Sequence, residues 1–148
     1  MHFQESLIDV DLNIPCDEIG NDHNINDLIM KKLQEKYQEK AFEKFGIIKT
    51  VKEIKKNIFQ QIMKTNGSFY FIFTILVENY VPKIYDHVTI PVKKILPYGI
   101  YLEEKNLKIL VSTTTSSERK IELHDVISVV LTDIRYEKDS FHCLAKLN

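Results

Sequence analysis

Residues 86–112 have the sequence DHVTIPVKKILPYGIYLEEKNLKILVS and contain three short segments of β type. We expect strands over Asp86–Leu96, Tyr98–Leu102 and Leu107–Ser112, because branched and aromatic residues dominate each of them. The segments are separated by two turn signals, Pro97-Tyr98-Gly99 and Glu104-Lys105-Asn106. This stretch therefore predicts consecutive short strands joined by turns.

The rest of this half continues the same pattern. Two more strands are expected over Asp125–Ile134 and Ser140–Leu147, with a turn at Glu137-Lys138-Asp139. Between the two groups of strands, Thr113–Lys120 is polar and rich in Ser and Thr, so we expect an exposed loop there. No helical pattern follows Pro82. Five short strands with such turns are typical of an OB-type β-barrel.

The amino-terminal half begins with alternating apolar and polar residues. Ile8–Ile14 has period-2 patterning, which predicts a strand with one wet face that ends at Pro15. The polar segment Cys16–Asn24 predicts a loop. Apolar residues then recur at spacings of three and four, and Asn24 or Asn26 can cap the start. We therefore expect a helix from about Asn26 to Lys40.

Three further segments of this half have β character. Ile47–Ile54 and Asn57–Met63 are candidate strands, and Phe69–Val77 predicts a largely buried central strand. Thr65-Asn66-Gly67-Ser68 carries the Asn-Gly signal of a tight hairpin turn. A helix on an antiparallel sheet is the arrangement that this order of elements favours.

Near Val81 the sequence pattern changes from a mixture of helix and strands to strands alone, and we place a domain boundary there. We predict an α+β protein with a helix-on-sheet domain over residues 1–81 and an OB-type barrel over residues 82–148. A length of 148 residues with 44% hydrophobic and 28% charged residues is ordinary for a folded protein. Two such small domains are each marginally stable, which favours halves that support each other or a larger partner.

The charge is nearly balanced in total but uneven along the chain. The formal net charge is −1, yet the first 27 residues contain seven Asp or Glu and no Lys or Arg. Basic residues predominate between Lys31 and Lys64. Poles of opposite sign suit docking on a polar partner, although ordinary surfaces also show them.

The sequence offers little for catalysis. It contains no phosphate-binding glycine loop, nucleophile elbow or metal-ligand spacing, and we expect no cofactor and no bound metal. His124-Asp125 is better explained as a solvated pair of polar side chains at a strand edge than as an acid–base pair. Cys16 and Cys143 form no disulfide framework, which favours a reducing intracellular compartment. Phe69–Val77 is too short to span a bilayer, so no membrane association is expected.

A role in binding single-stranded RNA follows from the predicted barrel. OB barrels stack bases on exposed aromatic side chains while basic groups hold the phosphates. Alternation along Tyr98–Leu102 directs Ile100 and Leu102 inward and Tyr101 outward. The candidate RNA-binding residues are Lys93, Lys94, Tyr98, Tyr101, Lys105 and Lys108. The alternative is that Tyr101 caps the barrel and the lysines are solvated surface.

Five segments, in this order, carry a resemblance to a known family. They are Met1–Ile14, Lys44-Phe45-Gly46-Ile47-Ile48, Thr65-Asn66-Gly67-Ser68-Phe69, Tyr98-Gly99-Ile100-Tyr101 and Ser140–Leu147. Their order along the whole chain resembles the stalk subunit of multisubunit DNA-directed RNA polymerases, a family that includes the seventh subunit of eukaryotic polymerase II and its archaeal equivalent. Asp86 stands where the family usually has Gly, and the insertion over Leu110–Ile121 is short. The compressed form resembles homologues encoded by large cytoplasmic DNA viruses.

The resemblance implies a non-catalytic subunit that docks on the polymerase core near the clamp and contacts emerging RNA. Its implied docking residues are Met1, His2, Phe3, Thr65, Asn66, Gly67 and Ser68. Simple core packing of Phe3 and an ordinary hairpin turn at Asn66-Gly67 are the alternatives.

The implied partners are the large polymerase subunits, a helical companion subunit and weakly bound single-stranded RNA. Ile58, Phe59 and Ile62 are candidates for the companion seam, with core packing as the alternative. The implied location is the cytoplasm or virion for a viral protein and the nucleus for a cellular one. The competing hypothesis is a free-standing OB-fold protein that binds single-stranded RNA, or one similar to a translation factor.

Overall fold

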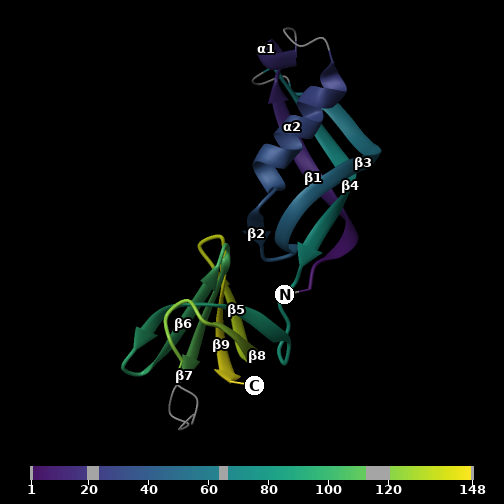
Figure 1. Ribbon diagram of the computed structural model, residues 1–148. Coiled ribbons are helices and arrows are strands. Elements are labelled where there is room, and N and C mark those ends of the chain that lie inside the picture. Colours follow the sequence, from purple (N-terminus) through teal and green to yellow (C-terminus); the bar gives the residue numbers. More distant parts are fainter. Residues whose placement is uncertain (1, 20–23, 64–66, 113–120, 148) are drawn as a thin grey trace. The chain divides into compact units, whose positions relative to one another are not determined.

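The structure is a computed structural model, and it describes residues 2–19, 24–63, 67–112 and 121–147. The chain forms two compact units, shown together in Figure 1. The first, here called the sheet unit, contains residues 3–39 and 48–79. The second, the barrel unit, contains residues 40–47 and the chain from Tyr80 onward, together with His2. Each unit is described separately below.

In its described residues, the first half of the chain contains a four-stranded sheet in the order β1-β4-β3-β2 and two helices. The elements are β1 (Gln4–Pro15), α1 (Cys16–Ile19), α2 (Ile25–Tyr37), β2 (Lys40–Phe42), β3 (Gly46–Ile62) and β4 (Ser68–Tyr80). Figure 1 shows α2 lying along the sheet.

Strict alternation in β1 and β4 builds the core of the sheet unit. The antiparallel pairing runs from Gln4 opposite Asn79 to Pro15 opposite Ser68. Every second residue is buried from Ile8 to Ile14 in β1 and from Phe71 to Asn79 in β4, as the period-2 pattern requires. The buried side chains are Ile8, Val10, Leu12 and Ile14 from β1, Phe71, Phe73, Ile75 and Val77 from β4, and Leu28, Ile29, Leu33 and Tyr37 from α2. The predicted helix-on-sheet arrangement is confirmed.

The helix boundaries follow from local chemistry. The Asn24 side chain accepts hydrogen bonds from the backbone N–H groups of Asn26 and Asp27, which caps α2. Gln38 is extended, with φ −73° and ψ 137°, so the helix ends at Tyr37 rather than near Lys40.

Two expectations for this half need correction. Residues 16–19 form the short helix α1 where a loop was expected, with Asp17 and Glu18 in its first turn, where acidic groups favour the helix dipole. The two candidate strands Ile47–Ile54 and Asn57–Met63 form the single strand β3. Beyond Val51 most of β3 is exposed on both faces. The polar residues between the two candidate segments therefore continue the strand, because no buried face has to be maintained there.

The second half forms a closed barrel in the order β5-β6-β7-β9-β8. Its strands are β5 (His87–Leu96), β6 (Gly99–Glu104), β7 (Leu107–Ser112), β8 (Val126–Glu137) and β9 (Ser140–Leu147). The β7–β9 pair is parallel, and the other neighbours are antiparallel. All five predicted strands are present, and the OB-like barrel and the α+β class are confirmed.

Alternating residues fill the barrel. Ile100 and Leu102 are 4% and 0% exposed, as predicted for inward positions of β6. Val88, Ile90, Leu107, Ile109, Val111, Val129 and Leu131 are fully or almost fully buried with them. Gly99 opens β6 because a Cβ there would lie 2.7 Å from the Val111 carbonyl oxygen.

Residues 40–47 belong to the barrel unit although the sequence places them before the expected limit at Val81. The Tyr136 hydroxyl donates a hydrogen bond of 2.9 Å to the Ala41 carbonyl oxygen. Gly46 has φ +77°, and a Cβ there would lie 2.3 Å from the Tyr80 carbonyl oxygen. Only glycine fits this backbone conformation and this close approach without strain. The two units are defined by packing, and the expected division into domains 1–81 and 82–148 stays a prediction.

Candidate nucleic-acid interface

A row of charged side chains crosses the outer face of the barrel. The strand registers place Arg135 of β8 opposite His142 of β9, and His142 opposite Lys108 of β7. Lys108 in turn lies opposite Glu103 of β6. Neighbouring strands lie about 4.8 Å apart, so these four side chains follow one another at close intervals. We call Arg135, His142 and Lys108 the basic row.

A second row, largely apolar in its middle, runs beside the first. Asp133 of β8 lies opposite Leu144 of β9, Leu144 opposite Leu110 of β7, and Leu110 opposite Tyr101 of β6. Leu144 is 49% exposed, although it sits in the middle of a sheet. Tyr101 and Leu110 are half-buried. We call Tyr101, Leu110 and Leu144 the apolar row.

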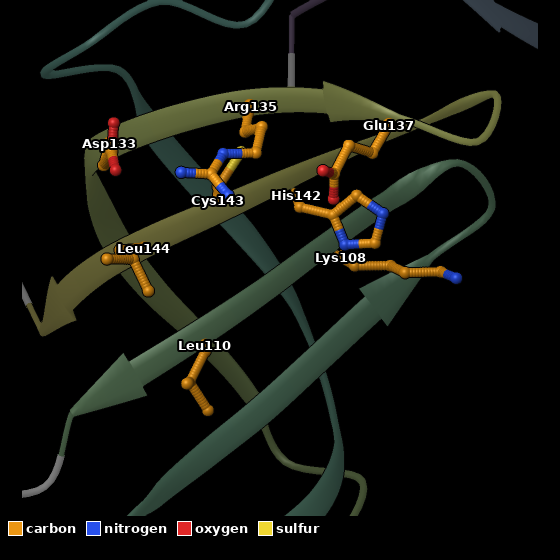
Figure 2. A pocket seen from close by; sticks show the side chains of 8 residues that line it. All are labelled: Lys108, Leu110, Asp133, Arg135, Glu137, His142, Cys143 and Leu144. Atoms are coloured by element: carbon orange, nitrogen blue, oxygen red, sulfur yellow. The ribbon is translucent and has the colours of Figure 1, made fainter.

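The two rows enclose a shallow hollow of about 310 Å³, here called the barrel groove. Its lining consists of the basic row, the carboxylates of Asp133 and Glu137, and the side chains of Leu110, Cys143 and Leu144. Figure 2 shows Arg135, His142 and Lys108 following one another across the groove, with Leu144 and Leu110 in the next row. Within the described ranges, the side chain of Arg135 makes no hydrogen bond or ion pair with another residue.

Ionisation at this face is set by burial and by one ion pair. Burial, with a smaller contribution from Asp133, raises the pKa of the Cys143 thiol to about 12, so this thiol is neutral. The hydrogen bond from Lys93 lowers the pKa of Glu103, and the same contact raises the pKa of Lys93. Burial, and then the Glu103 charge, raises the pKa of the Tyr101 hydroxyl.

The six residues proposed for RNA contact do not form one patch. Lys93 of β5 is ion-paired with Glu103, whereas the neighbouring Lys94 is exposed and lies opposite Tyr101. Lys108 lines the barrel groove. Tyr98 and Lys105 lie in the turns at opposite ends of β6, where Tyr98 is 66% exposed. Lys94, Tyr101 and Lys108 therefore share the barrel face, and the contact roles of all six stay predictions.

The residues that β8 and β9 contribute to the groove were not predicted from the sequence. Alternation in Ser140–Leu147 separates His142 and Leu144 from the buried Phe141 and Cys143. That signal shows which residues point outward. It does not reveal that β9 lies beside β7, because a parallel pair joins segments that are distant in the sequence.

Of the proposed docking residues, Phe3 and Ser68 lie toward opposite ends of the sheet unit, whereas His2 belongs to the barrel unit. Gln4, next to Phe3, pairs with Asn79, whereas Ser68 pairs with Pro15 at the far end of β1. The 12 residues of β1 are separated by eleven intervals of about 3.4 Å, so these ends lie roughly 37 Å apart. Figure 1 shows that β1 begins at the end of the sheet opposite α1. Met1, Thr65 and Asn66 lie outside the described residues.

Each end has a distinct character. The Phe3 ring is half-buried, and the Lys49 amine lies 5.5 Å from its centre, a cation–π contact. At the other end, a hollow of about 460 Å³ is lined mainly by apolar groups. Its lining residues are Ile25, Gln60, Gln61, Ile62, Phe69 and Phe71, and we call it the hairpin-end groove. Ser68, which begins β4 at this end, is 5% exposed.

Two other kinds of feature are absent from the described part of the chain. Among these residues, no group of three His, Cys, Asp or Glu side chains is arranged to hold a metal ion. Neither helix in that part of the chain has the length and apolar character needed to cross a membrane.

Comparison of the sequence with protein-family models and with curated proteins gave no match. The fold itself defines the class: a two-unit α+β protein that carries an OB-like barrel.

Proposed function

We propose that the protein is a non-catalytic stalk subunit of a multisubunit DNA-directed RNA polymerase. It docks on the polymerase core through the sheet unit and contacts emerging RNA through the barrel. The observation that supports this proposal best is the order of units along the chain, a helix on an antiparallel sheet followed by a closed barrel in the order β5-β6-β7-β9-β8. The five sequence segments that resemble the stalk family extend over both units.

The hairpin end of the sheet unit is the better candidate for docking. Ile62 is 58% exposed and Ile25 is 42% exposed beside the hairpin-end groove. Exposed apolar side chains beside a hollow are typical of protein–protein contacts. The Phe3 end offers a single half-buried ring that already contacts Lys49.

The proposal is tested by co-purification. The tagged full chain, expressed with its native polymerase, should retain the large subunits through moderate salt and nuclease treatment. Ile62→Asp places a charge in the hairpin-end groove, and we expect recovery of the large subunits to fall about tenfold or more. The control is Ile84→Asp in the barrel unit, because Ile84 has the same side chain and a similar exposure of 51%.

Deletion of Met1–Gln4 tests the other end of the sheet unit. The proposal is wrong if the unmodified chain recovers no large polymerase subunits, or if neither Ile62→Asp nor the deletion lowers their recovery. Partners that nuclease treatment releases would instead support the free-standing RNA-binding protein.

A further inference from the structure

The barrel face combines two features that single-stranded RNA requires. A single strand presents phosphates along one side and base faces along the other, and proteins bind it with cations and flat or apolar platforms. On the barrel, the basic row and the apolar row run side by side across the same strands. This parallel arrangement matches the two sides of the ligand.

The neighbouring carboxylates limit the part of the barrel face on which phosphates can bind. Glu103 lies at the β6 end of the basic row, and Asp133 and Glu137 flank Arg135 along β8. Carboxylates repel phosphates, so the favourable part of the row is confined to Arg135, His142 and Lys108. Lys93 is already paired with Glu103, which removes it as an independent phosphate contact. The row is therefore suited to two or three consecutive phosphates.

The apolar row supplies the platform for the bases. Leu144 is 49% exposed at the centre of the face, where burying it against a base removes apolar surface from water. Tyr101, at the β6 end of the same row, offers a ring on which a base can stack.

We propose that single-stranded RNA crosses the barrel from β8 to β6, with its phosphates on Arg135, His142 and Lys108 and its bases over Leu144, Leu110 and Tyr101. This inference rests on the proposed function, because it specifies where and how that function's RNA contact is made. It shifts the centre of the contact from β5 and the turns of β6 to the outer face of β7, β9 and β8.

The track makes a quantitative prediction about salt. For single strands, the logarithm of affinity falls with the logarithm of salt concentration with a slope of about 0.7 per neutralised phosphate. Arg135 and Lys108 are the two cations of the basic row, and two such contacts give a slope of roughly 1.4. Arg135→Ala should lower that slope by roughly 0.7 and weaken binding several-fold at low salt. Arg135→Lys should retain most of the slope, since it keeps the charge.

The experiment uses the full chain and a fluorescein-labelled oligouridylate of about 12 nucleotides, with binding followed by anisotropy from about 50 to about 200 mM KCl. Arg135→Ala and Lys108→Ala should each reduce the slope. Leu144→Ala should weaken binding with little change in slope, because it removes apolar surface that contacts the bases and leaves the charge unchanged. The charge control is Lys31→Ala on the exposed side of α2 in the sheet unit. Thermal melts confirm that each variant folds.

Lys94→Ala and Tyr98→Ala report on the face expected from the sequence. If these two variants weaken binding while Arg135→Ala and Leu144→Ala match the unmodified chain, the proposed track is wrong. Absence of any RNA binding at low salt, or equal losses from Lys31→Ala and Arg135→Ala, also overturns it. Recovery of the large polymerase subunits is measured separately, so the stalk assignment can stand or fall independently of the track.

Discussion

At the residue scale, the two cysteines have opposite environments and therefore opposite reactivities. Cys16 is exposed, whereas Cys143 is 4% exposed inside the barrel. Burial raises the pKa of Cys143 to about 12, so at pH 8 only about one thiol in ten thousand carries the reactive thiolate charge. We expect iodoacetamide to alkylate Cys16 in the native protein and Cys143 only after denaturation, as measured by peptide mass spectrometry. Equal labelling rates under native conditions would contradict a closed barrel.

At the element scale, Asp11 of β1 links this strand to α2 through contacts with Lys36 and Tyr37. Lys36 lies 3.0 Å from a carboxylate oxygen of Asp11, and the Tyr37 hydroxyl donates to the Asp11 backbone carbonyl at 2.7 Å. The hydrogen bond from Lys36 is the main cause that lowers the pKa of Asp11, and the bond from Tyr37 adds to it. This carboxylate is half-exposed, so its contribution is modest.

The lowered pKa gives this contact a pH dependence of known sign. A carboxylate whose pKa is lower in the folded state stabilises the protein above its unfolded pKa, and the stabilisation is lost as pH falls through the folded value. Asp11→Asn should therefore lower the free energy of unfolding by about 0.5–1 kcal/mol at pH 6. That difference should shrink toward pH 3. Urea unfolding of both proteins at the two pH values measures it, and a difference that grew in acid would contradict the assignment.

The elements show what local sequence determines and what it does not. Period-2 alternation in Ile8–Ile14 correctly predicted β1, because one strand face is buried and the other is wet. Beyond Val51 the residues of β3 no longer alternate between buried and exposed. The sequence pattern was therefore interpreted as two strands where the structure has one. The groove shows the same limit, since Arg135 and His142 meet only through strand pairing. Outward-facing residues were predictable from alternation, but their neighbours on other strands were not.

At the scale of the whole molecule, the sequence signal and the packing divide the chain differently. The loss of helical pattern at Pro82 marks where barrel strands begin, and this much is a local property. Residues 40–47 lie far before that point, yet they pack with the barrel. Ala41 is 2% exposed, and its carbonyl accepts the hydrogen bond from Tyr136, which is 95 residues away. No periodicity or turn signal encodes a contact over such a distance.

That contact allows the division into units to be tested. Tyr136→Phe removes the hydroxyl that satisfies the buried Ala41 carbonyl, and we expect the full chain to lose about 1 kcal/mol of stability. In a fragment of residues 82–148 the carbonyl is absent, so the same substitution should have almost no effect. The hydroxyl also lies 3.4 Å from an Asp139 oxygen, which accounts for any small residual change.

Denaturant unfolding, followed by fluorescence of the tyrosines that both forms retain, completes this comparison as a thermodynamic cycle. A fragment too unstable to give a folded baseline would also follow from the missing segment, because the barrel would lack part of its own unit. Equal losses in the full chain and a stably folded fragment would contradict this prediction, because the Tyr136 hydroxyl would then act independently of the Ala41 carbonyl. That result would favour the expected boundary near Val81, which already assigns residues 40–47 to the docking domain.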